Sequence, residues 1–532
     1  MEFDFVVVGA GSAGCALANR LSANPRYSVA LLEAGGVDRS PWIHIPVGYF
    51  KTIKEPSLNW MYRTEGDSGL NGRAINWPRG KTLGGSSSIN GLLYVRGQQQ
   101  DYDGWRQLGN VGWSWDDVLP FFKRAETWEG GESELRGGGG PLSVTKSRNS
   151  WEIVDAWVEA AQQAGFPFND DYNGETQDGV GYFQLTAHKG LRCSSAKAYL
   201  APIRQRENLT VLTNFLSHRV VLEGHRAVGV EGTHRGQRAL VRARRDVILS
   251  AGSIGSAQLM MLSGIGPGDH LRSHTISPIV DRKHVGANLQ DHLQARPVYK
   301  CRVPTINTRT RGLLNIVKIG AQYALNRTGP MTMAASLGTG YIKTRPELAS
   351  PDIQFHIQPF SAENPTTGTD TFDAFTASVL QLRPESRGEI RLKSNDPTEH
   401  PAITPNYLAT YLDQATIVDG IRVARRICRQ DAMEGLIIEE HAPGEHIDDE
   451  DFDGLLEWAR NTATTIYHPT GTCRMGSDED AVVDPRLRVR GVERLRIADC
   501  SIMPSIVSGN TNAPAIMIGE KASDMILEDA RA

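Results

Sequence analysis

Cysteine is scarce in this sequence of 532 residues, and its spacing argues against two classes of protein. Six cysteines are present and no two of them form a C-x-x-C pair: Cys15, Cys193, Cys301, Cys428, Cys473 and Cys500. This spacing argues against a zinc site and against a disulfide framework, and it suits a reducing compartment. We therefore expect no bound metal and a cytoplasmic location.

Long apolar runs and an excess of one charge are also absent. No uninterrupted apolar stretch reaches the roughly 20 residues of a transmembrane helix. Lys and Arg number 57 against 61 Asp and Glu, and the net charge of −4 gives no sign of nucleic-acid binding. The chain begins directly with an apolar run at residues 5–8, so we expect no signal peptide. Attachment to a membrane surface is left open.

The most informative feature that is present is a glycine fingerprint near the start. The apolar run at 5–8 is followed by G-A-G-S-A-G at 9–14, by apolar residues at helical spacing up to residue 21, and by a second apolar run that ends at Glu33. Strand, glycine turn, helix, strand and acid in this order are typical of a dinucleotide-binding βαβ unit. A glycine fingerprint alone is a weak signal, but here its flanks are all in place.

Each residue of the fingerprint has a physical reason. Gly9 permits a tight turn, Gly11 lets the backbone approach a pyrophosphate at the positive end of the helix, and Gly14 lets helix and strand pack closely. Glu33 follows at about the expected distance of roughly 20 residues, where a carboxylate accepts hydrogen bonds from ribose hydroxyls. The fingerprint therefore predicts a cofactor that contains ADP, without deciding between NAD and FAD.

Two further segments have a similar character. Residues 80–90, G-K-T-L-G-G-S-S-S-I-N, are rich in glycine and hydroxyl groups, which indicates a second cofactor contact, although a tight loop under a sheet has the same composition. Residues 495–499 are typical of a strand that ends in an acid, 508–514 of a turn, and 515–527 of a helix. We expect the two ends of the chain to build one domain around the middle.

The rest of the chain gives coarser predictions. Residues 151–165 and 256–262 have helical spacing, 209–250 are mostly strands, and 129–141 form a flexible exposed loop. The middle, about 300–455, has apolar segments, many prolines and no glycine fingerprint. It is expected to form a separate layer that faces the substrate, with a mixed or antiparallel sheet and helices.

With these pieces assembled, the chain resembles the glucose-methanol-choline (GMC) family of flavin-dependent oxidoreductases, and within it the bacterial branch similar to choline dehydrogenase. Motifs in the family's order carry the resemblance nearly from end to end: residues 5–36, 80–97, 251–266, 285–292 (V-G-A-N-L-Q-D-H), 468–476 (H-P-T-G-T-C-R-M-G) and 499–520. The resemblance implies an α/β fold with two parts. A Rossmann-like FAD-binding domain would take 1–300 and 455–532, with parts of 40–75 and 150–200 on the substrate side, and a substrate-binding domain 300–455.

The resemblance also implies the residues that hold FAD. They are Gly9, Gly11, Ser12, Ala13, Gly14, Glu33, Ala34, Gly84, Gly85, Ser86, Asn90, Gly91, Ser217, Asp499, Cys500, Thr511 and Asn512. Some members bind FAD covalently through a histidine, where this chain has Ile89. An isoleucine has no nucleophile, so non-covalent FAD is predicted. Choline-acting members carry a glutamate where alignment on residues 340–342 puts Leu337. Because a leucine cannot pair with a cation, a neutral alcohol is expected.

Two residues are candidates for catalysis. Oxidising an alcohol removes a hydroxyl proton and a carbon-bound hydride, and flavin N5 takes the hydride. The resemblance nominates His468 as the base, a role that suits histidine, and Asn510 as a hydrogen-bond donor to the developing alkoxide. Without the resemblance, one of 14 histidines would more often be a surface or core residue, and Asn510 could serve only the turn. His292 is expected to stabilise structure.

The sequence therefore predicts an FAD-dependent alcohol dehydrogenase or oxidase that converts a primary alcohol to an aldehyde. A lyase on the same flavin scaffold and an NAD-dependent dehydrogenase are the alternatives. The segments at 80–90 and 499–514 count against the NAD-dependent enzyme. The expected partners are the alcohol and an electron acceptor, either oxygen or a quinone or dye. Homodimer formation is left open.

Overall fold

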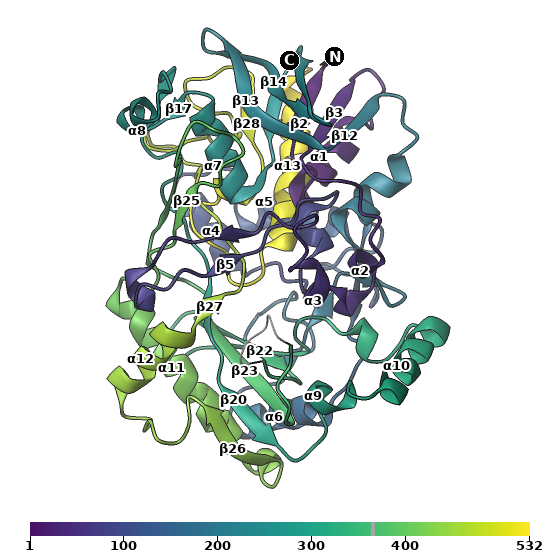
Figure 1. Cartoon of the computed structure of the whole chain (residues 1–532), viewed down its shortest axis with the longest axis vertical. Helices are drawn as coiled ribbons and strands as arrows, with labels where there is room; N and C mark the ends of the chain where they lie inside the picture. The colour runs from purple at the N-terminus through teal and green to yellow at the C-terminus, as the bar shows by residue number, and fades with distance from the viewer. Residues whose placement is uncertain (363–367, 532) are drawn as a thin grey trace.

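A five-stranded parallel sheet forms the upper part of the molecule (Figure 1). The computed structural model describes residues 1–362 and 368–531. Along the sheet the strands are β12 (Leu209–Thr213), β3 (Val29–Glu33), β2 (Phe5–Val8), β16 (Val247–Leu249) and β28 (Leu495–Ile497). β2, the first of these five strands along the chain, lies at the centre, and the later strands add on both sides of it. This is the doubly wound arrangement of dinucleotide-binding sheets. All of these strands except β12 are buried throughout, as expected for a parallel sheet covered on both faces.

The two ends of the chain meet in this part of the molecule. Helix α1 (Ser12–Leu21) packs against α13 (Asn512–Asp529), and both termini lie at the same end (Figure 1). Glu520 on α13 is fully buried. Its carboxylate accepts hydrogen bonds from Arg20 of α1 at 2.8 Å, from Arg124 of α5 (Trp115–Ala125) at 2.7 Å, and from the Tyr199 hydroxyl at 2.7 Å. One carboxylate thus joins helices from distant parts of the chain.

An antiparallel sheet forms the lower part of the molecule (Figure 1). Its order is β26 (Ile437–Ala442), β20 (Val298–Cys301), β23 (Ala374–Gln381), β22 (Ile353–Gln358), β21 (Gly338–Ile342) and β8 (Gly179–Tyr182). β19 (Leu293–Ala295) pairs with β23 and with β27 (Thr464–Thr465). Helices α6 (Glu152–Gln163) and α11 (Tyr411–Cys428) pack against this sheet and against each other. The expected α/β class, with a parallel and an antiparallel sheet, is confirmed.

Side chains alternate along β22 between the helix layer on one face of this sheet and a cavity on the other. Phe355 packs on Trp157 of α6 with ring centroids 5.4 Å apart. His356 and Gln358 line a cavity instead. Because side chains alternate along a strand, the apolar residues of β22 serve the helix layer and the polar ones face the cavity.

Most of the local predictions are confirmed. The helix expected at 151–165 is α6, and that at 256–262 lies within α7 (Gly252–Leu262). The region 209–250 contains β12, β13 (Phe215–Glu223), β14 (Arg226–His234), β15 (Gln237–Ala243) and β16. Within the described ranges, no helix is long and apolar enough to cross a membrane.

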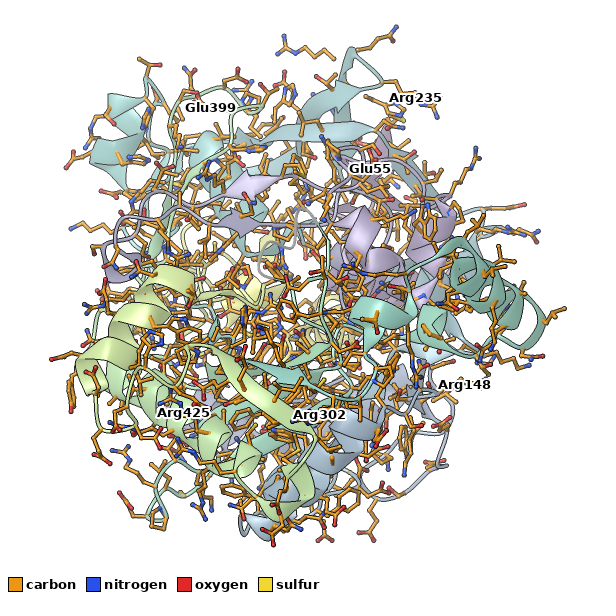
Figure 2. The ribbon with its side chains drawn as sticks, turned by 60° about the horizontal axis from the view of Figure 1, so that its bottom comes forward. Glu55, Arg148, Arg235, Arg302, Glu399 and Arg425 are labelled. Atoms are coloured by element: carbon orange, nitrogen blue, oxygen red, sulfur yellow. The ribbon has the colours of Figure 1, made fainter. Side chains whose placement is uncertain are left out.

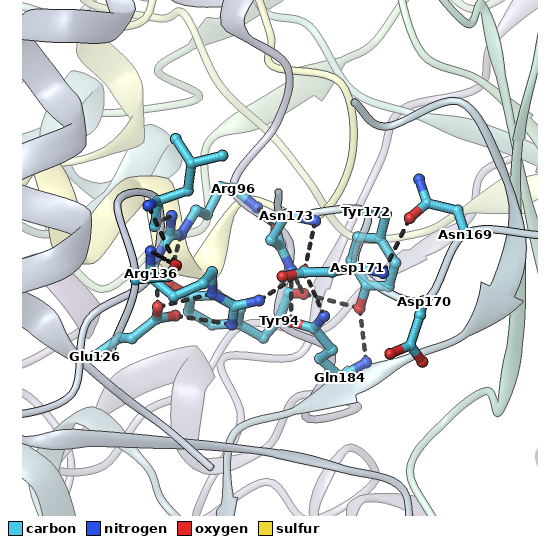
Figure 3. A network of polar contacts seen from close by, with 12 residues as sticks. Tyr94, Arg96, Glu126, Arg136, Asn169, Asp170, Asp171, Tyr172, Asn173 and Gln184 are labelled. Carbon is cyan, nitrogen blue, oxygen red and sulfur yellow. Dashed lines mark hydrogen bonds and ion pairs between the residues drawn. The ribbon is translucent and has the colours of Figure 1, made fainter. Parts of the chain in front are cut away.

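The exposed loop predicted at 129–141 is wrong at Arg136 (Figure 3). Residues 129–134 are exposed, but Arg136 is only 3% exposed. Its Nε donates to Glu126 at 2.9 Å and its Nη1 donates to Asp171 at 2.6 Å, while Arg96 also contacts Glu126. These carboxylates come from elsewhere in the chain, so composition could not indicate that a buried ion-pair network holds the loop.

Candidate active site

A cavity of about 640 Å³ is lined by residues of both sheets. Val8 and Glu33 reach it from the carboxyl ends of β2 and β3, while Gln294 and His356 reach it from the antiparallel sheet. The crevice outside the carboxyl ends of parallel strands is the usual ligand site of such sheets. Among the described residues, no group of three His, Cys, Asp or Glu side chains could hold a metal ion.

Bare backbone forms the cavity wall beside α1. Gly9 has φ of +99°, and a Cβ there would lie 2.4 Å from the Ser250 carbonyl oxygen. A Cβ at Gly85 would lie 2.7 Å from Cα of Gly11, so the two glycine loops touch each other. A Cβ at Gly14 would lie 1.9 Å from the Gly9 carbonyl oxygen, which is the close helix–strand contact expected from the sequence. This wall and the N-terminus of α1 suit a pyrophosphate.

The structure brings nearly all the candidate residues to this one cavity. The following line it: Gly9, Gly11, Ser12, Ala13, Glu33, Ala34, Gly85, Ser86, Asn90, Gly91, Ser217, His468, Asp499, Cys500, Asn510, Thr511 and Asn512. Gly14 and Gly84 do not line the cavity and lie behind the residues that do. Gly84 has φ of +86°, and its N–H donates to the Ala10 carbonyl at 2.8 Å. Both therefore shape the wall without facing a ligand.

Two buried carboxylates lie at the parallel sheet. Glu33 accepts hydrogen bonds from the N–H groups of Gly35 at 2.8 Å and Ala10 at 3.0 Å, and burial raises its pKa to about 7. Asp499 accepts from Ser256 Oγ at 2.6 Å and Gly252 N–H at 2.9 Å, and burial raises its pKa as well. Each carboxylate oxygen has two lone pairs, so both residues can still accept from a ligand hydroxyl.

A chain of hydrogen bonds fixes the proton on His468. Nε2 of His292 lies 3.0 Å from the Leu382 carbonyl oxygen, which can only accept, so this nitrogen carries hydrogen. Burial lowers the pKa of His292 to about 4, which keeps the ring neutral and leaves its Nδ1 as an acceptor. Nδ1 of His468, 3.1 Å away, must therefore donate.

The other ring nitrogen of His468 is then an acceptor at the cavity. Burial, and after it the fields of His292, His356 and Arg79, lower the pKa of His468 well below its ordinary value, so the ring is neutral. Its Nε2 accepts from Nδ2 of Asn510 at 3.1 Å. The lone pair of Nε2 and an amide N–H thus meet at one point of the cavity wall.

Asp291 holds the turn that carries His468. Its carboxylate accepts from the N–H of His468 at 2.6 Å and from the hydroxyls of Thr465 and Tyr407. Burial raises the pKa of Asp291 to about 6. Tyr467 has φ of +71°, a conformation that a bulky residue rarely adopts and that persists only where its surroundings enforce it.

Asn510 is held from a different part of the chain. The turn before it is fixed by Asp101, which accepts from Ser508 N–H at 2.7 Å and Ser508 Oγ at 2.8 Å. Gln177 donates to the Ser508 carbonyl at 3.0 Å. Oδ1 of Asn510 is buried and has no hydrogen-bond partner in the part of the chain that the structure describes, so the amide can serve a ligand.

Sequence reasoning missed the residues that position the site. Arg192 donates to Oδ1 of Asn90 at 2.6 Å and to its carbonyl at 2.7 Å, and burial lowers its pKa to about 9. Asp101 and Arg192 stand in no local pattern that could have indicated these contacts. Asp291 and His292 belong to the motif at 285–292, which was a usable signal, and His292 contacts His468 directly as well as stabilising structure.

Leu337, on which the expectation of a neutral alcohol rests, does not line the cavity. Leu337 directly precedes β21, is 1% exposed and packs in the hydrophobic core. A side chain buried away from the cavity cannot select a substrate by contact.

Comparisons with known proteins agree with this architecture. The family model described as GMC oxidoreductase matches residues 3–294 and 384–519. The mitochondrial choline dehydrogenase of Mus musculus is 42% identical over 99% of this chain and 89% of its own length. The oxygen-dependent choline dehydrogenase of Brucella suis biovar 1 is 42% identical over 99% of this chain and 96% of its own.

Solved structures give the same result. Pyridoxine 4-oxidase from Mesorbium loti superposes with a TM-score of 0.90 at 31% identity, covering 98% of both chains. A formate oxidase variant from Aspergillus oryzae RIB40, studied for FAD modification, superposes at 0.91 with 29% identity over 100% of this chain and 99% of its own. Fold and site thus define an FAD-dependent oxidoreductase that acts on CH–OH donors. The chain belongs to the GMC oxidoreductase family.

Proposed function

We propose that this protein oxidises a primary alcohol to the aldehyde, with His468 as the base. The observation that carries the proposal is the hydrogen-bond chain from Leu382 through His292 to His468. It leaves an acceptor lone pair on Nε2 at the cavity, next to the amide of Asn510. A substrate hydroxyl that enters between them replaces the hydrogen bond from Asn510 to Nε2: it donates to Nε2 and accepts from the amide.

The protein's own groups explain the proton step. His468 is neutral at pH 7 because burial lowers its pKa, so it is ready to take the hydroxyl proton. Once Nε2 is protonated, Nδ1–H still donates to His292. The Asn510 amide donates to the oxygen as negative charge develops there. FAD, when bound, supplies the acceptor for the hydride that leaves the alcohol carbon.

We also propose how FAD is held. The bare wall at Gly9, Gly11 and Gly85 suits the pyrophosphate, Glu33 suits the ribose, and the loops at 84–91 and 499–512 suit the rest of the cofactor, with Ser217 at the adenine. Ile89, which stands where some members of the family have the linking histidine, lines the cavity. Since its side chain has no nucleophile, FAD binds non-covalently. In this proposal, residues 1–300 and 455–532 form the FAD-binding part, with parts of 40–75 and 150–200 on the substrate side, and 300–455 form most of the substrate-binding part. The antiparallel sheet extends the substrate-binding part by β8, β19, β20 and β27. We also propose that the protein works in the cytoplasm.

Two observations on purified protein test this function. Acid precipitation should release the flavin into the supernatant, whereas yellow colour in the pellet would mean a covalent link. Under anaerobic conditions one or more primary alcohols should bleach the flavin absorbance and yield the aldehyde. Product formation without net bleaching would favour the lyase alternative, and bound NAD in place of flavin would favour the nicotinamide enzyme.

A further inference from the structure

The charges that line the cavity differ between its two sides. The lining carboxylates among the described residues are Glu33 and Asp499, and both lie at the parallel sheet with backbone N–H partners. The lining cations are Lys54, Arg79 and Arg296. Among the described residues, then, acids line only the parallel-sheet side.

Arg296 lies close to the segment that carries His468. It directly follows β19, and β19 pairs with β27, where Gln294 is opposite Thr464. Tyr467, next to His468, acts electrostatically on Arg296. Arg296 therefore belongs to the substrate side of the cavity rather than to the cofactor cradle.

Most N–H donors of the Arg296 guanidinium have no acceptor among the described residues. Its Nη2 donates to Oε1 of Gln358 at 3.2 Å, which is its one hydrogen bond to the described residues, and none of them forms an ion pair with it. A guanidinium has five N–H donors. Burial lowers its pKa, and the fields of Tyr467, Tyr49 and Asp370 only partly oppose that shift. Asp370 accepts a hydrogen bond from Ser361 Oγ at 2.7 Å and acts on Arg296 from a distance, without a hydrogen bond to the guanidinium. Two residues before Gln358 on β22, Nε2 of His356 is buried at the cavity and has no hydrogen-bond partner within residues 1–362 and 368–531.

We propose that Arg296 binds a carboxylate carried by the substrate, so that the substrate is a primary alcohol with an acid group at its other end. The inference rests on the proposed function and deepens it. A guanidinium binds a carboxylate through two parallel N–H bonds, and Gln358 orients it from β22. The same charge opposes a quaternary ammonium, so this cavity disfavours the choline named for its relatives.

A matched substrate series tests the proposal. The probes are 3-hydroxypropanoate, 4-hydroxybutanoate and 6-hydroxyhexanoate, each paired with the unsubstituted alcohol of equal length, together with choline. We expect kcat/KM for at least one hydroxy acid to exceed that of its paired alcohol by about 10-fold or more, and choline to be the poorest substrate. In Arg296→Gln, KM for that acid should rise about 10- to 100-fold. Arg296→Lys should recover part of the loss.

A control and a binding assay keep the outcomes distinct. Arg302→Gln removes an exposed arginine that does not line the cavity (labelled in Figure 2) and should leave the preference unchanged. Butanoate, which cannot be oxidised, should perturb the flavin spectrum of wild type and not that of Arg296→Gln. Neutral alcohols or choline reacting better than every acid would overturn the proposal alone. No reduction by any alcohol would instead overturn the proposed function, while butanoate binding would still report on Arg296.

An independent observation concerns helix α10 (Leu313–Asn326). Its side chains Leu313, Leu314, Ile316, Val317 and Leu325 are 55–86% exposed. The helix stands at the edge of the molecule in both views (Figures 1 and 2). Tyr323 is its one buried residue, and the Tyr323 hydroxyl donates to the Gly190 carbonyl at 3.1 Å. An exposed apolar surface of this kind usually marks a site that binds a protein or a membrane.

The charged residues near α10 in the sequence indicate what kind of surface the helix binds. Between residues 302 and 345 the sequence contains no Asp or Glu, and its basic residues are Arg302, Arg309, Arg311, Lys318, Arg327, Lys343 and Arg345. Exposed apolar side chains on a helix, in a sequence segment whose charged residues are all basic, are typical of helices that lie on an anionic bilayer.

The helix also borders the cavity. Ile306 and Thr310, just before α10, line the cavity. After α10, the turn η6 (Pro330–Thr332) packs between the helix and η1 (Pro46–Gly48), from which Val47 lines the cavity. We propose that α10 docks the protein on an anionic lipid surface, which places the cavity next to a lipid-soluble electron acceptor such as a quinone.

Vesicle sedimentation of the holoprotein tests the docking. Wild type should bind vesicles that contain a third phosphatidylglycerol, bind pure phosphatidylcholine at least about 10-fold more weakly, and be released by salt. Leu314→Glu combined with Val317→Glu should abolish binding while the flavin spectrum and melting temperature stay unchanged. Val111→Glu, which changes an apolar residue 75% exposed elsewhere, should bind as wild type. Absence of vesicle binding, or a dimer that the α10 variant dissociates, would overturn the proposal.

Discussion

At the scale of single residues, the central feature is that the ring nitrogens of His468 have different roles. Nδ1 donates to His292 and Nε2 accepts from Asn510, each at 3.1 Å. A histidine fixed in this tautomer can accept from the substrate without a change of tautomer, once the substrate hydroxyl replaces the Asn510 amide at Nε2. Burial contributes further by keeping the ring neutral.

The pH dependence follows from that burial. The base works only when unprotonated, and its pKa lies below the ordinary value of about 6.5. Activity should therefore be present at neutral pH and be lost only as pH falls through the lowered pKa. We expect kcat/KM to be flat from pH 7 to 8 and to fall about tenfold per pH unit on an acid limb below pH 6.5. A limb centred above pH 7 would mean that another group is the base.

The sequence could predict this site only where motifs carry it. His468 and Asn510 lie in segments that resemble a family, and those segments indicated their roles. Asp101 and Arg192 act on residues far away in the chain, 407 positions from Ser508 and 102 from Asn90. No local pattern reports such contacts, since they exist only after the chain has folded.

At the scale of elements, glycine decides how close α1 comes to the parallel sheet. The fingerprint predicted this contact because the residues that make it, Gly9 and Gly14, are close in the sequence and face each other across one turn. The arrangement of the antiparallel sheet was less predictable. Its strands β19 and β27 pair although Gln294 and Thr465, one from each strand, lie 171 positions apart, and periodicity carries no information about such partners.

Gly14→Ala tests the element scale. A Cβ there would lie 1.9 Å from the Gly9 carbonyl oxygen, so α1 must move away from the sheet. We expect weaker FAD binding, measured by flavin fluorescence on dilution, together with a lower melting temperature. Gly104→Ala, in helix α4 (Gln99–Gln107) with nothing within 4 Å of its Cβ, is the matched control and should bind FAD as wild type. Equal FAD affinity in both variants would contradict this role of Gly14.

At the scale of the whole molecule, function depends on joining the two ends of the chain. β2 and β28 share one sheet, and α1 packs on α13. The bare glycine wall comes from Gly9, Gly11 and Gly85 near the start of the chain, while His468 and Asn510 come from near its end. The strand, turn and helix pattern at 495–527 predicted this closure, but not the buried Glu520 that ties α1, α5 and α13 together.

Glu520→Ala tests the closure. Removing one partner of a fully buried ion pair costs about 3–5 kcal/mol. Here Arg20 is 28% and Arg124 is 34% exposed, so water can partly solvate them. We expect the free energy of unfolding to fall by about 2–3 kcal/mol, measured by urea denaturation followed by flavin release. Lys146→Ala removes an exposed ion pair with Asp170 and should change it by less than about 1 kcal/mol.

Anaerobic stopped-flow reduction of the flavin tests the central claim most directly. With the best alcohol of the series, His468→Ala should reduce its bound flavin about 10²- to 10⁴-fold more slowly than wild type, because the base is gone. His284→Ala, which removes a surface histidine beside Asp480, should react at the wild-type rate. Reduction of His468→Ala at the wild-type rate, with its flavin fully bound, would contradict the account.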